Sequence, residues 1–179
     1  MTGESMKRPK TPDEILALHK LLRFDPQQYL RIVNRWIAEN PKNSSAYFSR
    51  HFAWIRVGEP QRALEDINKM IELEPEPHPI SLLSRGDVYR HLGEYEKAIE
   101  DYNRAEAIDP AEWQDGVFGL FFQADTHARL GNEAAALACC ALLPDDFWTP
   151  GFKGGPGGGK AEIADELRRR AAQARQKRS

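Results

Sequence analysis

The sequence predicts an all-α fold, a right-handed α-solenoid of helix–turn–helix repeats that ends in a capping helix. Two long segments, residues 47–75 and 82–110, align without a gap at an offset of 35 residues. In each segment apolar residues recur at helical spacing, stop at a glycine, and recur again as far as a proline. This pattern indicates two copies of one helix pair, and helix pairs that cannot bury their apolar faces singly stack into an array.

The composition fits one packed array. The 179 residues are 41% hydrophobic and 29% charged, and no apolar run approaches the roughly 18 residues that a membrane-spanning helix needs. The first ten residues lack the apolar stretch of a secretory signal. We therefore expect a cytoplasmic protein that enters no membrane. The neighbouring Cys139 and Cys140 are expected to form no structural disulfide, because adjacent residues on a helix point about 100° apart.

Four helix pairs are expected in the array. With a disordered segment at 1–10 before them, they are predicted at about 11–41, 44–75, 79–110 and 117–143, which together make an array over 11–143. Thr11 and Glu14 predict the start of the first helix, because a threonine and a glutamate at this spacing cap a helix reciprocally. Gly58, Gly93 and Gly131 are predicted to end later first helices, since glycine takes the left-handed conformation at no steric cost.

A connector and a last helix are expected after the array. Residues 144–159 form a predicted Pro/Gly-rich linker, in which six of the nine residues from 151 to 159 are glycine. Residues 160–179 are predicted to form a capping helix with a basic tail. Its narrow apolar stripe is suited to cover the last helix pair. The stripe consists of Ile163, Leu167, Ala171 and Ala174.

A set of residues in the second copy resembles a known repeat family. These residues are Leu82, Arg85, Gly86, Tyr89, Ala98, Tyr102 and Pro110. Their spacing resembles the tetratricopeptide repeat, whose pattern reads W-x-x-L-G-x-x-Y, A-x-x-x-F and P over about 34 residues. Leu82 stands in place of the usual Trp, and Arg85 in place of the usual Leu. The first copy departs further, with His51 at the glycine position and Ile67 at the aromatic position.

The resemblance implies an interaction module and no enzyme. In this family the first helices line a concave groove that receives an extended or helical peptide from a partner. The positions implied to line the groove are Phe48, Phe52, Ile55, Arg56, Leu83, Ser84, Asp87, Arg90, Phe118, Phe121, Phe122, Asp125 and Arg129. Family members that grip the terminal carboxylate of a chaperone use Lys, Asn and Arg at positions that hold Phe and Ser here. That clamp is therefore not expected.

Charged and aromatic residues would divide the work in this groove. We expect Arg56 and Arg90 to fix the register of an acidic or C-terminal peptide beside rings such as Phe52 and Phe121. A competing interpretation is that the C-terminal segment, or the residues around Phe147, folds back and covers these rings. The partner is an unidentified protein or peptide, and a homo-oligomer remains open.

The basic C-terminal helix leaves a second function open, association with RNA. Its cations are Arg168, Arg169, Arg170, Arg175, Lys177 and Arg178. Acidic residues precede them, so the helix dipole alone accounts for their order. No aromatic residues alternate with them as single-stranded nucleic acid binding would favour, and nucleic acid is the lesser expectation.

A third hypothesis is a nucleotide-binding enzyme, because Gly154 and the pair Gly159-Lys160 match the spacing of a phosphate-binding loop. Ala161 stands where that loop needs a hydroxyl, and no predicted strand precedes it, so the spacing favours a linker. Lys160 is then expected only to begin the last helix. Replacing Lys160 with Ala is expected to leave stability nearly unchanged.

No catalytic site, metal site or other cofactor is predicted. The repeated neighbours Glu65-Asp66 and Glu100-Asp101 do not share a helix face, and we interpret them as a solvated surface of the repeats. The five histidines form no i,i+4 pair and none lies at ligand spacing from a cysteine.

Overall fold

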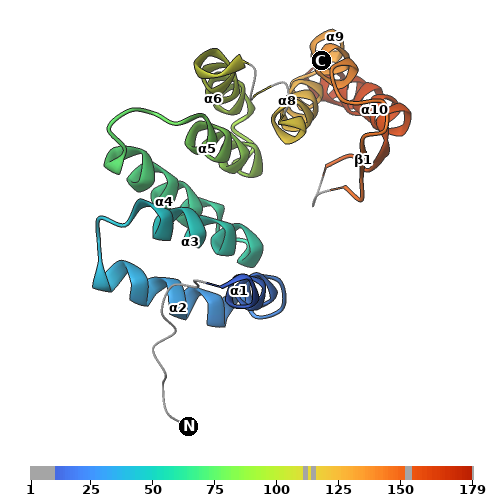
Figure 1. Ribbon diagram of the computed structural model, residues 1–179. Helices are drawn as coiled ribbons and strands as arrows, with labels where there is room; N and C mark the ends of the chain where they lie inside the picture. Colours follow the sequence, from blue (N-terminus) through green and yellow to red (C-terminus); the bar gives the residue numbers. More distant parts are fainter. Residues whose placement is uncertain (1–10, 111–112, 114–115, 152–154, 179) are drawn as a thin grey trace. The chain divides into compact units, whose positions relative to one another are not determined.

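The computed structural model confirms the predicted all-α fold of consecutive helix pairs (Figure 1). It describes residues 11–110, 113, 116–151 and 155–178, so the predictions for residues 1–10 and for Gly154 lie outside the described residues. The chain divides into two compact units, the N-terminal unit Met1–Pro77 and the C-terminal unit His78–Ser179. The elements are α1 Pro12–Phe24, α2 Pro26–Glu39, α3 Ser44–Val57, α4 Pro60–Leu73, α5 Pro79–Leu92, α6 Tyr95–Ile108, α8 Val117–Arg129, α9 Glu133–Ala141, β1 Trp148–Thr149, β2 Gly158–Gly159 and α10 Lys160–Arg178.

The N-terminal unit consists of the pairs α1/α2 and α3/α4. The predicted capping box begins α1: the Thr11 hydroxyl accepts a hydrogen bond from the amide of Glu14, and the Glu14 carboxylate accepts one from the amide of Thr11. The core of this unit contains Val33 and Trp36 of α2 together with Ala53 of α3. Small residues such as Ala53 let α3 lie close to α2, so the side of α3 that carries Ala53 is committed to packing.

Glycines end the first helices as predicted. Gly58 follows α3 with φ 82°, and Gly93 follows α5 with φ 79°. Both lie in the left-handed region, and their amides bond back to carbonyls in the last helical turn. Gly131 takes the same conformation, φ 84°, two residues after α8 ends. The chain therefore turns at these glycines and the second helix of each pair can fold back on the first.

The C-terminal unit consists of α5/α6, α8/α9 and α10. α10 packs against both α8 and α9, and Ile163, Leu167 and Ala171 are fully buried there. Ala174, the last residue of the predicted stripe, is half-buried. α10 thus covers apolar surface of the α8/α9 pair, and it brings its charged residues beside α8.

A short antiparallel pair of strands forms where only a connector was predicted. Trp148 of β1 pairs with Gly159 of β2, and Thr149 pairs with Gly158. Gly158 has φ 108°, which is a conformation that a side chain disfavours. This pairing brings the start of α10 back beside the segment that follows α9.

Candidate functional site

A buried ion pair ties α3 to α4. Arg50 donates from Nε and Nη2 to the two carboxylate oxygens of Asp66, at 2.8 and 2.6 Å. Arg85 of α5 binds Asp101 of α6 in the same way, at 2.6 and 2.7 Å. The predicted solvated surface was wrong for the two aspartates, because both are buried.

The signal for these pairs was present in the sequence. Arginine and aspartate recur sixteen residues apart in both copies, and Arg85 stands where the family has Leu. In the third pair the same two positions hold Gln123 and Cys139, whose thiol donates to the amide oxygen at 3.6 Å. Burial raises the pKa of Cys139 to about 11, so this thiol keeps its proton. A bidentate contact between a guanidinium and a carboxylate fixes how a helix is rotated about its own axis. It thereby also fixes which residues lie on the opposite face of that helix.

The glycines that follow α3, α5 and α8 show which positions on these three first helices are equivalent. The offset is 35 residues from Gly58 to Gly93 and 38 residues from Gly93 to Gly131. One equivalent position, which we call the carboxylate position, is held by Phe52, Asp87 and Asp125. The position four residues later, which we call the cation position, is held by Arg56, His91 and Arg129. The two units differ at the first of these positions and agree in character at the second.

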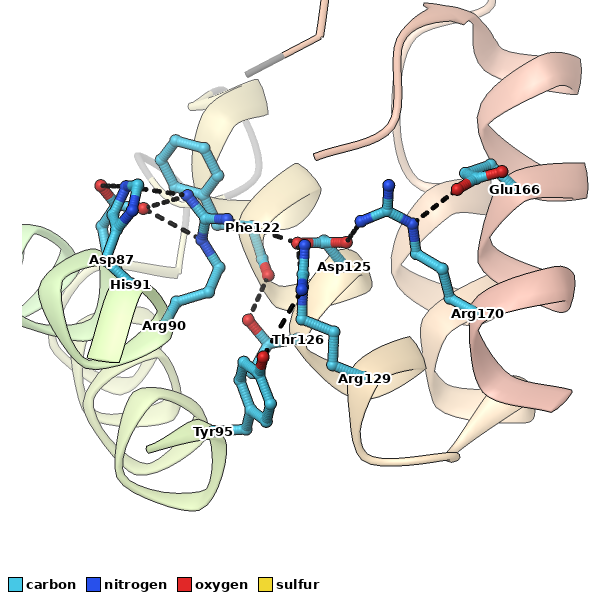
Figure 2. Close-up of polar contacts among 10 residues, drawn as sticks. All are labelled: Asp87, Arg90, His91, Tyr95, Phe122, Asp125, Thr126, Arg129, Glu166 and Arg170. Carbon is cyan, nitrogen blue, oxygen red and sulfur yellow. Dashed lines mark hydrogen bonds and ion pairs between the residues drawn. The ribbon is translucent and has the colours of Figure 1, made fainter. Parts of the chain in front are cut away.

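In the C-terminal unit these positions belong to a buried ion network (Figure 2). The Asp125 carboxylate is bound by three guanidinium groups, at 3.4 Å, 2.8 Å and 2.7 Å; in that order they belong to Arg90 of α5, Arg129 of α8 and Arg170 of α10. Two further carboxylates hold the outer arginines: Asp87 binds Arg90 at 2.6 Å and Glu166 binds Arg170 at 2.8 Å. Three cations face three anions, so the network is close to neutral and links α5, α8 and α10.

Arg90 shows how firmly this network is held. Its side chain is 4% exposed, and its guanidinium also lies over the ring of Phe122 at 5.0 Å. Burial opposes the charge of Arg90, but Asp87 and the other surrounding groups outweigh it and raise the pKa of the guanidinium. Arg90 and Asp125 were predicted to line the groove, yet both are enclosed by the unit itself. Their role in the structure is to hold helices together.

The aromatic residues of α8 divide between core and surface. Phe121 is 1% exposed and its ring lies 5.8 Å from that of Phe147, so the competing interpretation holds for this residue. Phe118 is 50% exposed. Phe122 is half-buried, and its ring centroid lies 6.3 Å from that of Phe118. Trp148, next to Phe147, is 66% exposed. Of the α5 positions in the prediction, Leu83 packs against the core and Ser84 is half-buried.

In the N-terminal unit the predicted residues remain together on α3. Phe48 and Phe52 meet edge to face with ring centroids 5.1 Å apart, and Phe52 is 43% exposed. Ile55 is half-buried and Arg56 is exposed. The Arg56 guanidinium donates to the backbone carbonyl of Arg23 at the end of α1 (2.9 Å).

The end of α1 extends this surface. The guanidinium of Arg23 lies over the ring of Phe24 at 5.3 Å, and Phe24 is 75% exposed. Because the Arg56 bond connects the two helix ends, the rings and the two cations form one surface. We call it the aromatic–cation patch, and it consists of Arg23, Phe24, Phe48, Phe52, Ile55 and Arg56.

Lys160 does more than begin α10, so that expectation was wrong. Its ammonium group donates to the carbonyls of Ala141 and Leu143 (2.9 and 2.6 Å) and pairs with Asp145 at 3.0 Å. It therefore caps the carbonyl end of α9. A lysine engaged in this way is not positioned as a phosphate-binding loop requires.

The cations of α10 are largely engaged as well. Arg168 pairs with Asp165, Arg169 with Glu166, and Arg175 with Glu133, in addition to the pairs of Arg170. The side chain of Arg178 lies outside the described part of the chain. The interpretation of α10 as an RNA-binding helix loses support, because these cations already have anionic partners in the protein.

Two features of the described residues bear on other classes of function. None of the described helices is long and apolar enough to cross a membrane. In the same part of the chain no three His, Cys, Asp or Glu side chains gather as a metal site would require.

Consecutive helical hairpins, tied internally and covered by a last helix, define a helical-repeat protein. A family model described as "Tetratricopeptide repeat" matches residues 79–111. Residues 79–111 accordingly match a tetratricopeptide repeat, in agreement with the resemblance of the second copy. A search of the curated proteins finds no match.

Solved structures give the same fold. One similar structure is MamA, with a TM-score of 0.60 at 14% identity over 96% of this chain and 98% of that one. Another is a thermophilic TPR protein in Thermus thermophilus, with a TM-score of 0.63 at 20% identity over 94% and 84%. A third is MamA from residue 41 to the end, from Desulfovibrio magneticus, with a TM-score of 0.62 at 15% identity over 91% and 89%. At these identities the likeness concerns the fold alone.

Proposed function

We propose that the protein is a cytoplasmic, non-enzymatic adaptor whose first helices bind a peptide segment of a partner protein. The observation that carries this proposal is the exposure of large rings on the first helices of both units, with Phe52 43% and Phe118 50% exposed. Neither ring is needed to fill a core. Exposed aromatic residues that lie beside cations are typical of interaction surfaces.

The fold supports the same function class. Tetratricopeptide arrays are interaction scaffolds in general, and their first helices present side chains along a common face. In this chain two of the first helices, α3 and α5, are held to their second helices by a buried ion pair, Arg50 with Asp66 and Arg85 with Asp101. A rigid helix face lowers the cost of binding, because little ordering remains to be done when a partner arrives.

A selection from a random-peptide display library against the full chain tests this proposal. We expect peptides whose affinity falls by about tenfold or more on Phe52→Ala or Phe118→Ala, which is the scale of an interface anchor. Thermal unfolding of each variant must stay close to that of the parent protein. Ile108→Ala is the matched control, because Ile108 is an equally exposed apolar residue (51%) on the second helix α6. Failure to select any peptide, or equal losses with the control, would contradict the proposal.

A further inference from the structure

The two units treat the cation position differently, and this difference points to the chemistry of a partner. In the C-terminal unit a carboxylate precedes the residue at the cation position, Arg129 or His91, by one helical turn. Asp125 binds Arg129 at 2.8 Å, and Asp87 lies 3.6 Å from His91. Residues four apart on a helix face each other, so these pairs form within one helix.

In the N-terminal unit Phe52 takes the carboxylate position, and Arg56 has no such neighbour. Within the described residues no carboxylate forms an ion pair with Arg56 or with Arg23. The acidic residues nearest in sequence, Asp25 and Glu59, form no ion pair with these arginines. The Asp25 carboxylate accepts a hydrogen bond from the amide of Gln28 and so caps α2. Glu59 is the residue that precedes α4. The Arg56 guanidinium thus binds the backbone carbonyl of Arg23 at the end of α1, and neither of these two arginines has an ion-pair partner among the described residues.

The segment that contains α1, α2 and α3 also has a net positive charge. Among the described residues 11–58, Lys and Arg together exceed Asp and Glu by three. One of these cations, Arg50, pairs with the buried Asp66 of α4. A guanidinium whose N–H groups are not all used within the protein is suited to bind a carboxylate in a bidentate contact. Apolar groups of the same partner can then pack on the exposed rings beside it. The cations and the exposed rings therefore favour an occupant that has a carboxylate beside an apolar group.

We propose that the aromatic–cation patch binds a peptide segment in which an Asp or Glu side chain lies beside an apolar side chain. The partner's carboxylate pairs with Arg56, in the role that Asp125 has toward Arg129 in the C-terminal unit. The apolar side chain packs against Phe48 and Phe52. The peptide thereby supplies the carboxylate that this one first helix lacks, and the acidic residue sets its register along α3.

This inference rests on the proposed peptide-binding function. The inference can be wrong even if the protein binds peptides. The test uses the peptides selected on the full chain, resynthesised with amidated ends so that a terminal carboxylate cannot substitute for a side chain. We expect one recurring Asp or Glu next to an apolar residue. Its replacement by Asn or Gln should weaken binding by about tenfold or more in fluorescence anisotropy, as loss of a charged contact does.

Three protein variants sharpen the test. Phe52→Asp copies the C-terminal unit by giving Arg56 an internal carboxylate, and Arg56→Glu reverses the charge. Both are expected to weaken binding by about tenfold or more, since each removes the attraction for an acidic side chain. Arg35→Glu, at an exposed residue of α2, makes the same charge change elsewhere and should alter affinity less than about twofold. Arg56→Glu should recover binding to a peptide whose acidic residue is replaced by Lys.

The outcomes separate the two proposals. Selected peptides without an acidic residue, or an affinity that Arg56→Glu and Arg35→Glu change equally, would overturn the inference while peptide binding stands. Binding that requires a free terminal carboxylate or a phosphorylated residue would overturn it as well. If no peptide binds, both the proposed function and the inference fall.

Discussion

The same helix position has opposite environments in the two units. In the C-terminal unit Asp125 is 1% exposed and is surrounded by three guanidinium groups. In the N-terminal unit that position is Phe52, which is 43% exposed and lies four residues before an exposed arginine. The carboxylate draws neighbouring helices together, whereas the ring leaves α3 with an open surface. One repeat position thus holds a carboxylate that binds neighbouring helices in one unit and a partly exposed ring in the other.

The largest expected effect is on the closed side of this comparison. Asp125→Ala leaves Arg90 buried with one of its two carboxylates missing, and it frees Arg170 from α8. We expect a loss of about 3–5 kcal/mol in the free energy of unfolding, the scale for breaking a buried ion pair. Phe52→Ala at the equivalent position should cost about 1 kcal/mol or less, because that ring is already partly in water. Urea unfolding followed by circular dichroism measures both, and equal losses would contradict the comparison.

A second effect concerns how tightly the hairpins pack. A Cβ at Gly86 would lie 2.5 Å from Cε1 of Tyr102, whose side chain is fully buried. Gly86→Ala is expected to cost about 1–3 kcal/mol, the scale of overpacking. The equivalent residues of the N-terminal unit, His51 and Ile67, are both buried, so a larger first residue there accompanies a smaller second one.

A double-mutant cycle sharpens this point. Part of the cost of Gly86→Ala should disappear in the background Tyr102→Leu, because the shorter side chain relieves the contact. Neighbouring residues commonly show coupling of about 0.5–3 kcal/mol. Strictly additive losses in urea unfolding would show that Gly86 is not constrained by this ring.

The sequence predicted the hairpins well because its signals were local. Apolar spacing and the glycines at 58 and 93 identify helices and turns within a few residues of each other. The Arg50–Asp66 pair was missed, although it recurs, because charged residues were taken for surface. The site was harder to predict, since the burial of Asp125 depends on Arg170, 45 residues away. Nothing within α8 itself shows that another helix supplies that cation.

A third, smaller effect tests how α10 is attached to the C-terminal unit. Lys160→Met keeps the length of the side chain but removes its bonds to the carbonyls of Ala141 and Leu143. We expect a loss of about 1–2 kcal/mol, because hydrogen bonds from a charged group are involved and the side chain is 26% exposed. Lys177→Met, at an exposed residue of the same helix, is the control and should change little. A loss shared by both variants would point to net charge instead of the cap.

The smallest effect separates equivalent positions by their response to pH. Trp54, Tyr89 and His127 occupy one position on α3, α5 and α8. The Nδ1 atom of His127 is buried without a hydrogen-bond partner among the described residues, and burial lowers the pKa of this histidine below its usual 6.5. The folded protein therefore keeps His127 neutral to a lower pH than the unfolded chain does, and the unfolded chain takes up a proton as the pH falls through that ordinary value. Stability that is complete above it is lost progressively below it.

His127→Tyr tests this prediction by restoring the residue that α5 has at the same position. The free energy of unfolding, measured by urea titration from about pH 8 to about pH 5, should fall more steeply on the acid side in the parent protein than in the variant. The direction follows from the sign of the pKa shift, because the unfolded state gains the proton at a higher pH than the folded state does. Parallel curves for the parent protein and His127→Tyr would mean that His127 has the same pKa in the folded and unfolded states, and would contradict the prediction.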